Sequence, residues 1–184
     1  MVRYQSAEGW HIHDPPCGGG ASTYEGARGG GIRTTPQQVQ RNLERWRWFG
    51  LSAGTPRWVG RKVTILLDSV ILIDHFNGAA AATAYLHRVR NMAAISVVTR
   101  AEVLTGFTPP NEALARPLLD SFPVLPLTRE AADLAAHLRR EHRWKLPDAF
   151  QAALAQIHKL QLATRNTNDF PPEKFSFVTV PYSV

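Results

Sequence analysis

The chain has 184 residues, of which 44% are hydrophobic and 20% charged, enough for one ordinary globular domain with an appendage. No apolar run reaches the roughly 18 residues of a membrane-spanning helix, and the first residues lack the pattern of a signal peptide. The single cysteine, Cys17, excludes an intrachain disulfide framework and favours a reducing, cytoplasmic setting. Of the formal net charge of +6, residues 1–62 supply +5, so charge is weak evidence for nucleic acid binding by the rest.

Residues 1–62 differ in composition from the remainder of the chain. They contain eleven of the thirteen glycines and four of the five tryptophans. Up to about residue 34 there is no apolar periodicity, so we expect irregular or disordered chain. A Thr-Pro pair at 35–36 then resembles a helix start, and Val39, Leu43 and Trp46 share one helical face. These features predict a short helix over 36–49.

Three interpretations of this extension stay open. It is a disordered or partly helical tail, or a basic, Trp-bearing arm that contacts RNA or a partner. Alternatively it is absent from the native product, because a bacterial gene can start at a GTG codon and Val63 directly precedes the first strand. His11, His13 and Cys17 do not make a convincing metal site, because no fourth ligand is present at a suitable spacing.

From Val63 onwards the pattern becomes regular. The run 63–67 is β-branched and aliphatic throughout, which is typical of a strand buried on both faces. Further strands are expected at 94–98, 124–127, 162–164 and 175–180. Helices are expected at 70–76, 79–90, 99–107, 111–122, 128–142 and 147–160, with Thr99 and Glu102 matching a capping box. Strands that alternate with helices predict an α/β fold with a mostly parallel central sheet.

Four carboxylates occur at junctions between these elements. Asp68 ends the first strand, Glu102 lies early in the helix after the second, and Asp169 lies in the loop after 162–164. Strand-to-helix junctions of a parallel sheet share one edge, where such sheets bind ligands, so these three should converge. Asp148 begins a helix and joins them only if that helix points its N-terminus at the same edge.

Four acidic side chains in one pocket would raise one another's pKa values unless a cation neutralises them. A ligand set of oxygen atoms without Cys or His suits Mg²⁺ or Mn²⁺. Such ions keep positions open for a phosphate and a water, and can activate that water to attack a phosphodiester. The pattern therefore favours metal-assisted phosphodiester hydrolysis.

Simpler explanations exist for each acid taken singly. Glu102 and Asp148 could be helix caps or partners of the helix dipole, and Asp169 could be part of an ordinary turn. Asp68 is harder to dismiss, because a carboxylate that ends a buried strand needs a partner. Asp74 is a weaker candidate, placed on the outer part of its helix.

Residues 63–184 resemble the PIN-domain family, most closely its VapC-like toxin ribonucleases. The resemblance implies a PIN-like three-layer α/β/α sandwich and a Mg²⁺- or Mn²⁺-dependent endoribonuclease. Its acidic residues, both catalytic and metal-binding, map onto the four carboxylates above. The resemblance also implies a cognate antitoxin and a homodimer or toxin–antitoxin hetero-oligomer. The stretches that carry it are Leu66-Leu67-Asp68-Ser69, Ile71-Leu72-Ile73-Asp74, Ile95-Ser96-Val97-Val98-Thr99, Glu102-Val103-Leu104, Leu146-Pro147-Asp148-Ala149 and Ala163-Thr164-Arg165-Asn166-Thr167-Asn168-Asp169-Phe170.

One position departs from the family pattern. Val70 stands where the family commonly has Asn, Ser or Cys, two residues after the first acid. Ser69 keeps a hydroxyl beside that acid, and Thr164 and Asn166 could supply further polar contacts. We interpret the change as altering the surroundings of the metal ligands rather than removing the metal.

Arg100 and Arg165 lie beside acidic positions and are candidates for holding RNA phosphates, although both could equally be surface salt-bridge residues. The sequence as a whole predicts a metal-dependent ribonuclease that is the toxin of a toxin–antitoxin pair. Two alternatives stay open: an RNA-processing PIN nuclease without an antitoxin, and a degenerate domain that binds RNA or a partner without cutting it.

Overall fold

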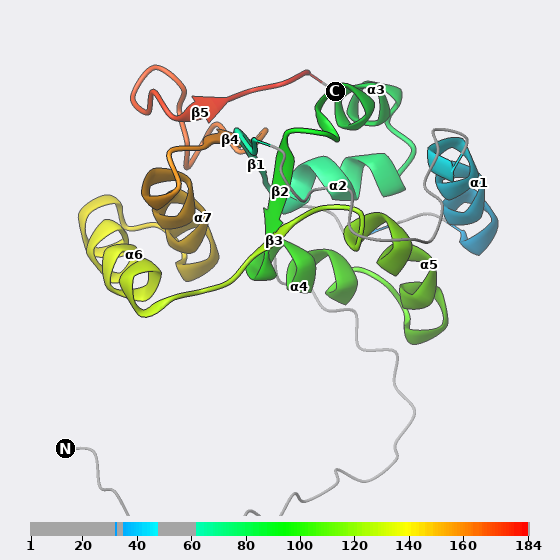
Figure 1. The fold of residues 1–184 in the computed structure, drawn as a ribbon, viewed down its shortest axis with the longest axis horizontal. Helices are drawn as coiled ribbons and strands as arrows, with labels where there is room; N and C mark the ends of the chain where they lie inside the picture. Colours follow the sequence, from blue (N-terminus) through cyan, green and yellow to red (C-terminus); the bar gives the residue numbers. More distant parts are fainter. Residues whose placement is uncertain (1–31, 33–34, 48–61, 184) are drawn as a thin grey trace, which may run out of the picture.

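The computed structural model describes residue 32, residues 35–47 and residues 62–183 (Figure 1). The predicted irregular segment up to about residue 34 therefore lies almost entirely outside the described residues, as do His11, His13 and Cys17. Within the described part of the chain, no helix has the length and apolar character required to cross a bilayer.

A five-stranded parallel sheet forms the centre of the molecule. Its strand order is β3-β2-β1-β4-β5, so β1 is the middle strand and pairs with β2 on one side and β4 on the other. The last residue of β1, Leu67, lies opposite Ile95 and Ala163. The strands are β1 (Ile65–Leu67), β2 (Ala93–Ser96), β3 (Val124–Leu125), β4 (Gln161–Ala163) and β5 (Val178–Thr179).

Helices cover both faces of this sheet (Figure 1). Successive side chains of a strand point to opposite faces, and β1 shows this directly. Leu67 packs into the core beneath α2 to α5, whereas Leu66 packs into the core beneath α6 and α7. The predicted three-layer α/β/α sandwich is thereby confirmed. The helices are α2 (Ser69–Phe76), α3 (Ala80–Val89), α4 (Val97–Thr105), α5 (Pro109–Leu119), α6 (Arg129–His142) and α7 (Leu146–Ile157).

The second strand and the helix after it meet at a different residue from the one predicted. The strand ends at Ser96, and Val97 already belongs to α4. The Ser96 hydroxyl accepts the N–H of Thr99 at 2.9 Å, so Ser96 is the N-cap and the predicted capping box at Thr99 is wrong. A serine in the strand–helix junction satisfies an otherwise unpaired helix N–H, which ends the strand two residues early.

A further helix, α1 (Pro36–Arg47), precedes the sheet and packs against α5 and α2. Val39 is fully buried in the core beneath α2 to α5. Ile32 packs on Gly106, where an added Cβ would come within 3.2 Å of the Ile32 Cδ1 atom. The Leu43 and Trp46 side chains lie outside the described set. A domain boundary at residue 63 stays a prediction, but α1 lies against the domain.

The packing of α1 leads to a testable expectation. Val39→Ala should lower the free energy of unfolding by about 1–2 kcal/mol, because it removes two fully buried methyl groups. Gln37→Ala, on the exposed side of the same helix, is the matched control and should change it by less than about 0.5 kcal/mol. Urea denaturation of the full-length chain gives both values. Equal stability of the two variants would contradict the observed docking of α1.

Candidate active site

Asp68 occupies the junction between the central strand β1 and α2. Its carboxylate caps α2 by accepting the N–H of Ser69 at 2.7 Å, and it accepts the Thr164 hydroxyl at 2.5 Å. The residue is only 8% exposed. Burial raises the pKa of Asp68, while the hydrogen bonds from Thr164 and Ser69 partly offset this effect. The acid therefore lies in a desolvated position and is held by neutral donors.

Glu102 lies on α4, the helix that comes after the neighbouring strand β2. Burial raises its pKa, a hydrogen bond from the Ser69 hydroxyl lowers it, and the charge of Asp68 raises it again. Glu102 is thus close enough to Asp68 for the charge of Asp68 to raise its pKa, and Ser69 contacts both acids.

Asp148 lies in the first turn of α7, and its pKa depends on the other three acids. Burial raises its pKa, and the negative charges of Asp169, Asp68 and Glu102 raise it further, to about 6. Lys145 acts in the opposite direction. The helix therefore points its N-terminus at the carboxyl edge of the sheet. This is the condition under which Asp148 is expected to join the other three acids.

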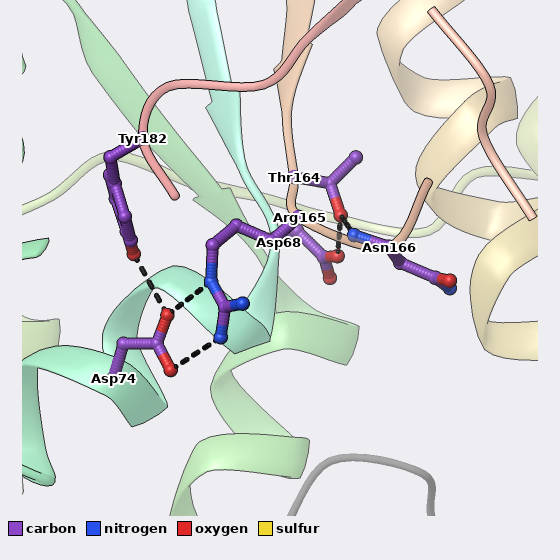
Figure 2. A network of polar contacts seen from close by, with 6 residues as sticks. All are labelled: Asp68, Asp74, Thr164, Arg165, Asn166 and Tyr182. Carbon is purple, nitrogen blue, oxygen red and sulfur yellow. Dashed lines mark hydrogen bonds and ion pairs between the residues drawn. The ribbon is translucent and has the colours of Figure 1, made fainter. Parts of the chain in front are cut away.

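Asp169 belongs to the turn after β4. The side-chain amide of Asn166 donates to its carboxylate at 2.8 Å, and the Trp144 indole N–H donates to its backbone carbonyl at 2.8 Å. The Thr164 hydroxyl accepts the backbone N–H of Asn166 at 2.9 Å and donates to Asp68 (Figure 2). One short turn thus orients two of the four acids.

The donor set suits a hard divalent cation, since the four acids offer only oxygen ligands. Burial raises the pKa of Asp148, and repulsion by the other acids raises it further; such a cation would relieve that repulsion. Within the described residues, however, no three His, Cys, Asp or Glu side chains already form a ligand set. Charge coupling acts over longer distances than metal coordination, so the two observations are compatible.

The two candidate phosphate-binding arginines are both in ion pairs. Arg165 donates from Nε and Nη2 to Asp74 at 2.5 and 2.8 Å, and Arg100 pairs with Asp120 at 2.8 Å. The sequence pattern predicts that Asp74 lies on the outer part of its helix, but its side chain is only 13% exposed. The signal for its burial is its position as the single acid in the otherwise largely apolar helix α2.

Tyr182 completes the Asp74 cluster from the C-terminal segment. Its hydroxyl donates to Asp74 at 3.0 Å, and Figure 2 shows the Asp74 carboxylate bonded both to this hydroxyl and to the Arg165 guanidinium. Burial and the charge of Asp74 raise the pKa of Tyr182, so its hydroxyl stays protonated and can donate. Arg165 and Thr164 are adjacent in sequence, and the cluster therefore anchors the turn that supports Asp68.

Comparison with known proteins identifies the fold family. The family model for the PIN domain matches residues 65–171. The chain belongs to the PIN domain family. The chain is 39% identical over 127 residues to ribonuclease VapC10 of Mycobacterium tuberculosis strain H37Rv, an alignment that covers 65% of this chain and 94% of that PIN protein. The predicted resemblance is confirmed.

Solved structures agree with this assignment. A toxin–antitoxin complex from Klebsiella pneumoniae contains a chain 37% identical to this PIN protein, with a TM-score of 0.61, covering 66% of this chain and all of that one. FitAcB from Neisseria gonorrhoeae has the same fold at 22% identity, with a TM-score of 0.56 and the same coverage. A chain of VapBC2 from Rickettsia felis is 18% identical, with a TM-score of 0.54. The match covers 63% of this chain and 96% of the Rickettsia felis chain.

The raised pKa of Asp148 predicts how stability depends on pH. A carboxyl group whose pKa is higher in the folded than in the unfolded state stabilises the fold at low pH, and this contribution is lost as pH rises. The free energy of unfolding in EDTA should therefore fall between about pH 4 and pH 6, the range between the ordinary value and the raised one. Burial raises the pKa values of Asp68 and Glu102 as well, which strengthens the same trend.

Asp148→Asn should flatten this dependence, because the amide does not titrate. Asp133→Asn, which alters an exposed acid on α6, should leave the slope unchanged. Urea denaturation at a series of pH values measures both. A slope in Asp148→Asn as steep as that of the wild type would show that the pKa of Asp148 is not raised in the folded protein.

Proposed function

We propose that this PIN protein is a Mg²⁺- or Mn²⁺-dependent endoribonuclease that hydrolyses RNA phosphodiester bonds and is the toxin of a toxin–antitoxin pair. The single observation that carries the nuclease proposal is the meeting of four acids at one edge of the sheet. Asp68, Glu102 and Asp169 follow neighbouring parallel strands, and burial, followed by the charges of these acids, raises the pKa of Asp148. Four acids at one edge of a sheet suit a site that recruits a cation. The ribonuclease named among its relatives supports RNA as the substrate.

Asp68, Asp148 and Asp169 would hold the metal, and Glu102 would either bind it or position the attacking water. When bound, the ion would polarise the phosphodiester and activate water. Thr164 keeps Asp68 oriented by a hydrogen bond from its hydroxyl, and Asn166 orients Asp169 by a hydrogen bond from its side-chain amide. Because these donors are neutral, they orient the acids without cancelling the negative charge that attracts a cation.

Arg100 and Arg165 would contact RNA phosphates from the margin of this site. Each already pairs with an acid, and a guanidinium carries five N–H donors, more than one carboxylate uses. Phosphate contacts of this kind hold the substrate without reading its bases.

The partner proposal rests on what the relatives are. Three of the solved structures are named as a toxin–antitoxin complex or as a VapBC or FitAB pair, so we propose a cognate antitoxin and a homodimer or toxin–antitoxin hetero-oligomer for this chain. We place its action in the cytoplasm, where an RNA substrate is present and a lone cysteine stays reduced.

Asp68→Asn is the sharpest test of the nuclease. Asparagine can still cap α2, whereas alanine would also remove the cap and cost about 0.5–2 kcal/mol of stability. RNA cleavage should fall by at least about 100-fold. Loss of a metal ligand should reduce activity more than loss of a residue that only hydrogen-bonds to a ligand, which typically costs about 10–100-fold. Cleavage of a fluorescent RNA in Mn²⁺ measures the change.

Asp133→Asn is the control and should cleave like the wild type. Excess EDTA should stop cleavage by the wild type, and added Mn²⁺ should restore it. Full activity of Asp68→Asn, or full activity in EDTA, would refute a metal-dependent site at Asp68.

The toxin role has a separate test in cells. Inducing the full-length chain should arrest growth, and co-expressing the product of the neighbouring upstream reading frame should restore it. Asp68→Asn, expressed at the same level, should permit growth throughout. Cleavage of RNA in vitro without growth arrest would favour an RNA-processing nuclease that has no antitoxin.

A further inference from the structure

A fully buried hydroxyl connects the strand and the two helices that carry three of the four acids. The Thr99 Oγ1 atom donates to the backbone carbonyl of Leu67 at 3.0 Å. It accepts the side-chain amide of Gln151, and it accepts the Ser96 hydroxyl at 3.2 Å. A threonine hydroxyl has one donor and two acceptor positions, so Thr99 uses its whole hydrogen-bonding capacity here.

Each partner of Thr99 lies close in sequence to one acid. Leu67 directly precedes Asp68 in the chain, and Gln151 lies one helical turn after Asp148 on α7. Thr99 itself lies one turn before Glu102 on α4. Residues three apart on a helix share a face, so the hydrogen bonds of Thr99 join the same faces of α4 and α7 that carry the acids.

The arrangement is costly for a purely structural contact. Thr99 and Ser96 are fully buried and Gln151 is 2% exposed, so three polar side chains have lost their water. The Gln151 Oε1 atom has no hydrogen-bond partner within the described residues, a deficit worth about 1–3 kcal/mol. Apolar side chains of the same size would fill this space without that cost. Stability alone therefore does not explain the buried pair of Thr99 and Gln151.

We propose that Thr99, together with Gln151, is a positioning residue that fixes the spacing of Asp68, Glu102 and Asp148 for a divalent cation. This inference rests on the proposed function. The acids repel one another, and nothing in their own charges keeps them together. The Thr99 hydroxyl supplies a short-range connection between β1, α4 and α7 that opposes this repulsion. Both side chains are buried, so they would act through the acids rather than on the substrate.

Thr99→Val tests the proposal, because valine keeps the shape of threonine and lacks the hydroxyl. Calorimetric titration of the full-length protein with Mn²⁺, without RNA, should show affinity reduced by about 10–100-fold. Thr99→Ser keeps the hydroxyl and should restore most of the affinity. In cleavage assays, Thr99→Val should need more Mn²⁺ for half-maximal rate, and saturating Mn²⁺ should recover the rate.

Thr83→Val is the matched control. Thr83 is a half-buried threonine on α3 whose hydroxyl lies 2.9 Å from His75 Nδ1, near the opposite end of α2 from Asp68. The control should lose stability and keep its Mn²⁺ affinity. A merely structural role for Thr99 would make the two variants behave alike.

Gln151→Met provides a second, independent variant if Thr99→Val does not fold. It removes the amide that donates to Thr99, and it should weaken Mn²⁺ binding in the same direction. Combined with Thr99→Val, its effect on Mn²⁺ affinity should be less than additive, because both changes break the same hydrogen bond between Gln151 and Thr99. Wild-type Mn²⁺ affinity in both single variants would overturn this inference and leave the proposed function standing. Absence of Mn²⁺ binding by the wild type would overturn both.

Discussion

Repulsion among four carboxylates is the constraint on which the rest of this site depends. Burial raises the pKa of Asp148, and the charges of the three other acids raise it further. Neutral groups hold the acids in place: Thr164 donates to Asp68, and Asn166 donates to Asp169. The nearby arginines pair with other acids, Asp74 and Asp120. The fold thus keeps a net negative charge at the carboxyl edge of the sheet, which Lys145 only partly offsets and which a cation can neutralise.

The topology explains why residues so distant in sequence meet there. Asp68 directly follows the central strand β1, and the two neighbouring strands lead into the elements that carry Glu102 and Asp169. Parallel strands place all these junctions at one edge, which is the general ligand site of open α/β sheets. The Asp74–Arg165–Tyr182 cluster then ties the C-terminal segment and α2 to the turn after β4. Positioning therefore comes from several weak contacts around the acids rather than from one strong one.

The helix α1 lies before the residues that the PIN family model matches. About two-thirds of this chain spans 94% of the VapC10 ribonuclease and all of the chain from Klebsiella pneumoniae. Val39 of α1 is buried together with residues of α2 and α5. The outer surface of these two helices is consequently covered, in part, by the protein's own N-terminal segment.

The sequence by itself determined the alternation of strands and helices and the placement of Asp68, Glu102 and Asp169 at junctions, because apolar periodicity and turn residues are local signals. It left the position of Asp148 conditional, since only packing decides where the N-terminus of α7 points. The bond from Thr164 to Asp68 spans 96 residues, and the pair of Arg165 with Asp74 spans 91. Contacts of that range leave no periodic trace in a sequence. The tertiary structure therefore decided which neutral side chains hold the acids, and it assigned Arg165 to Asp74.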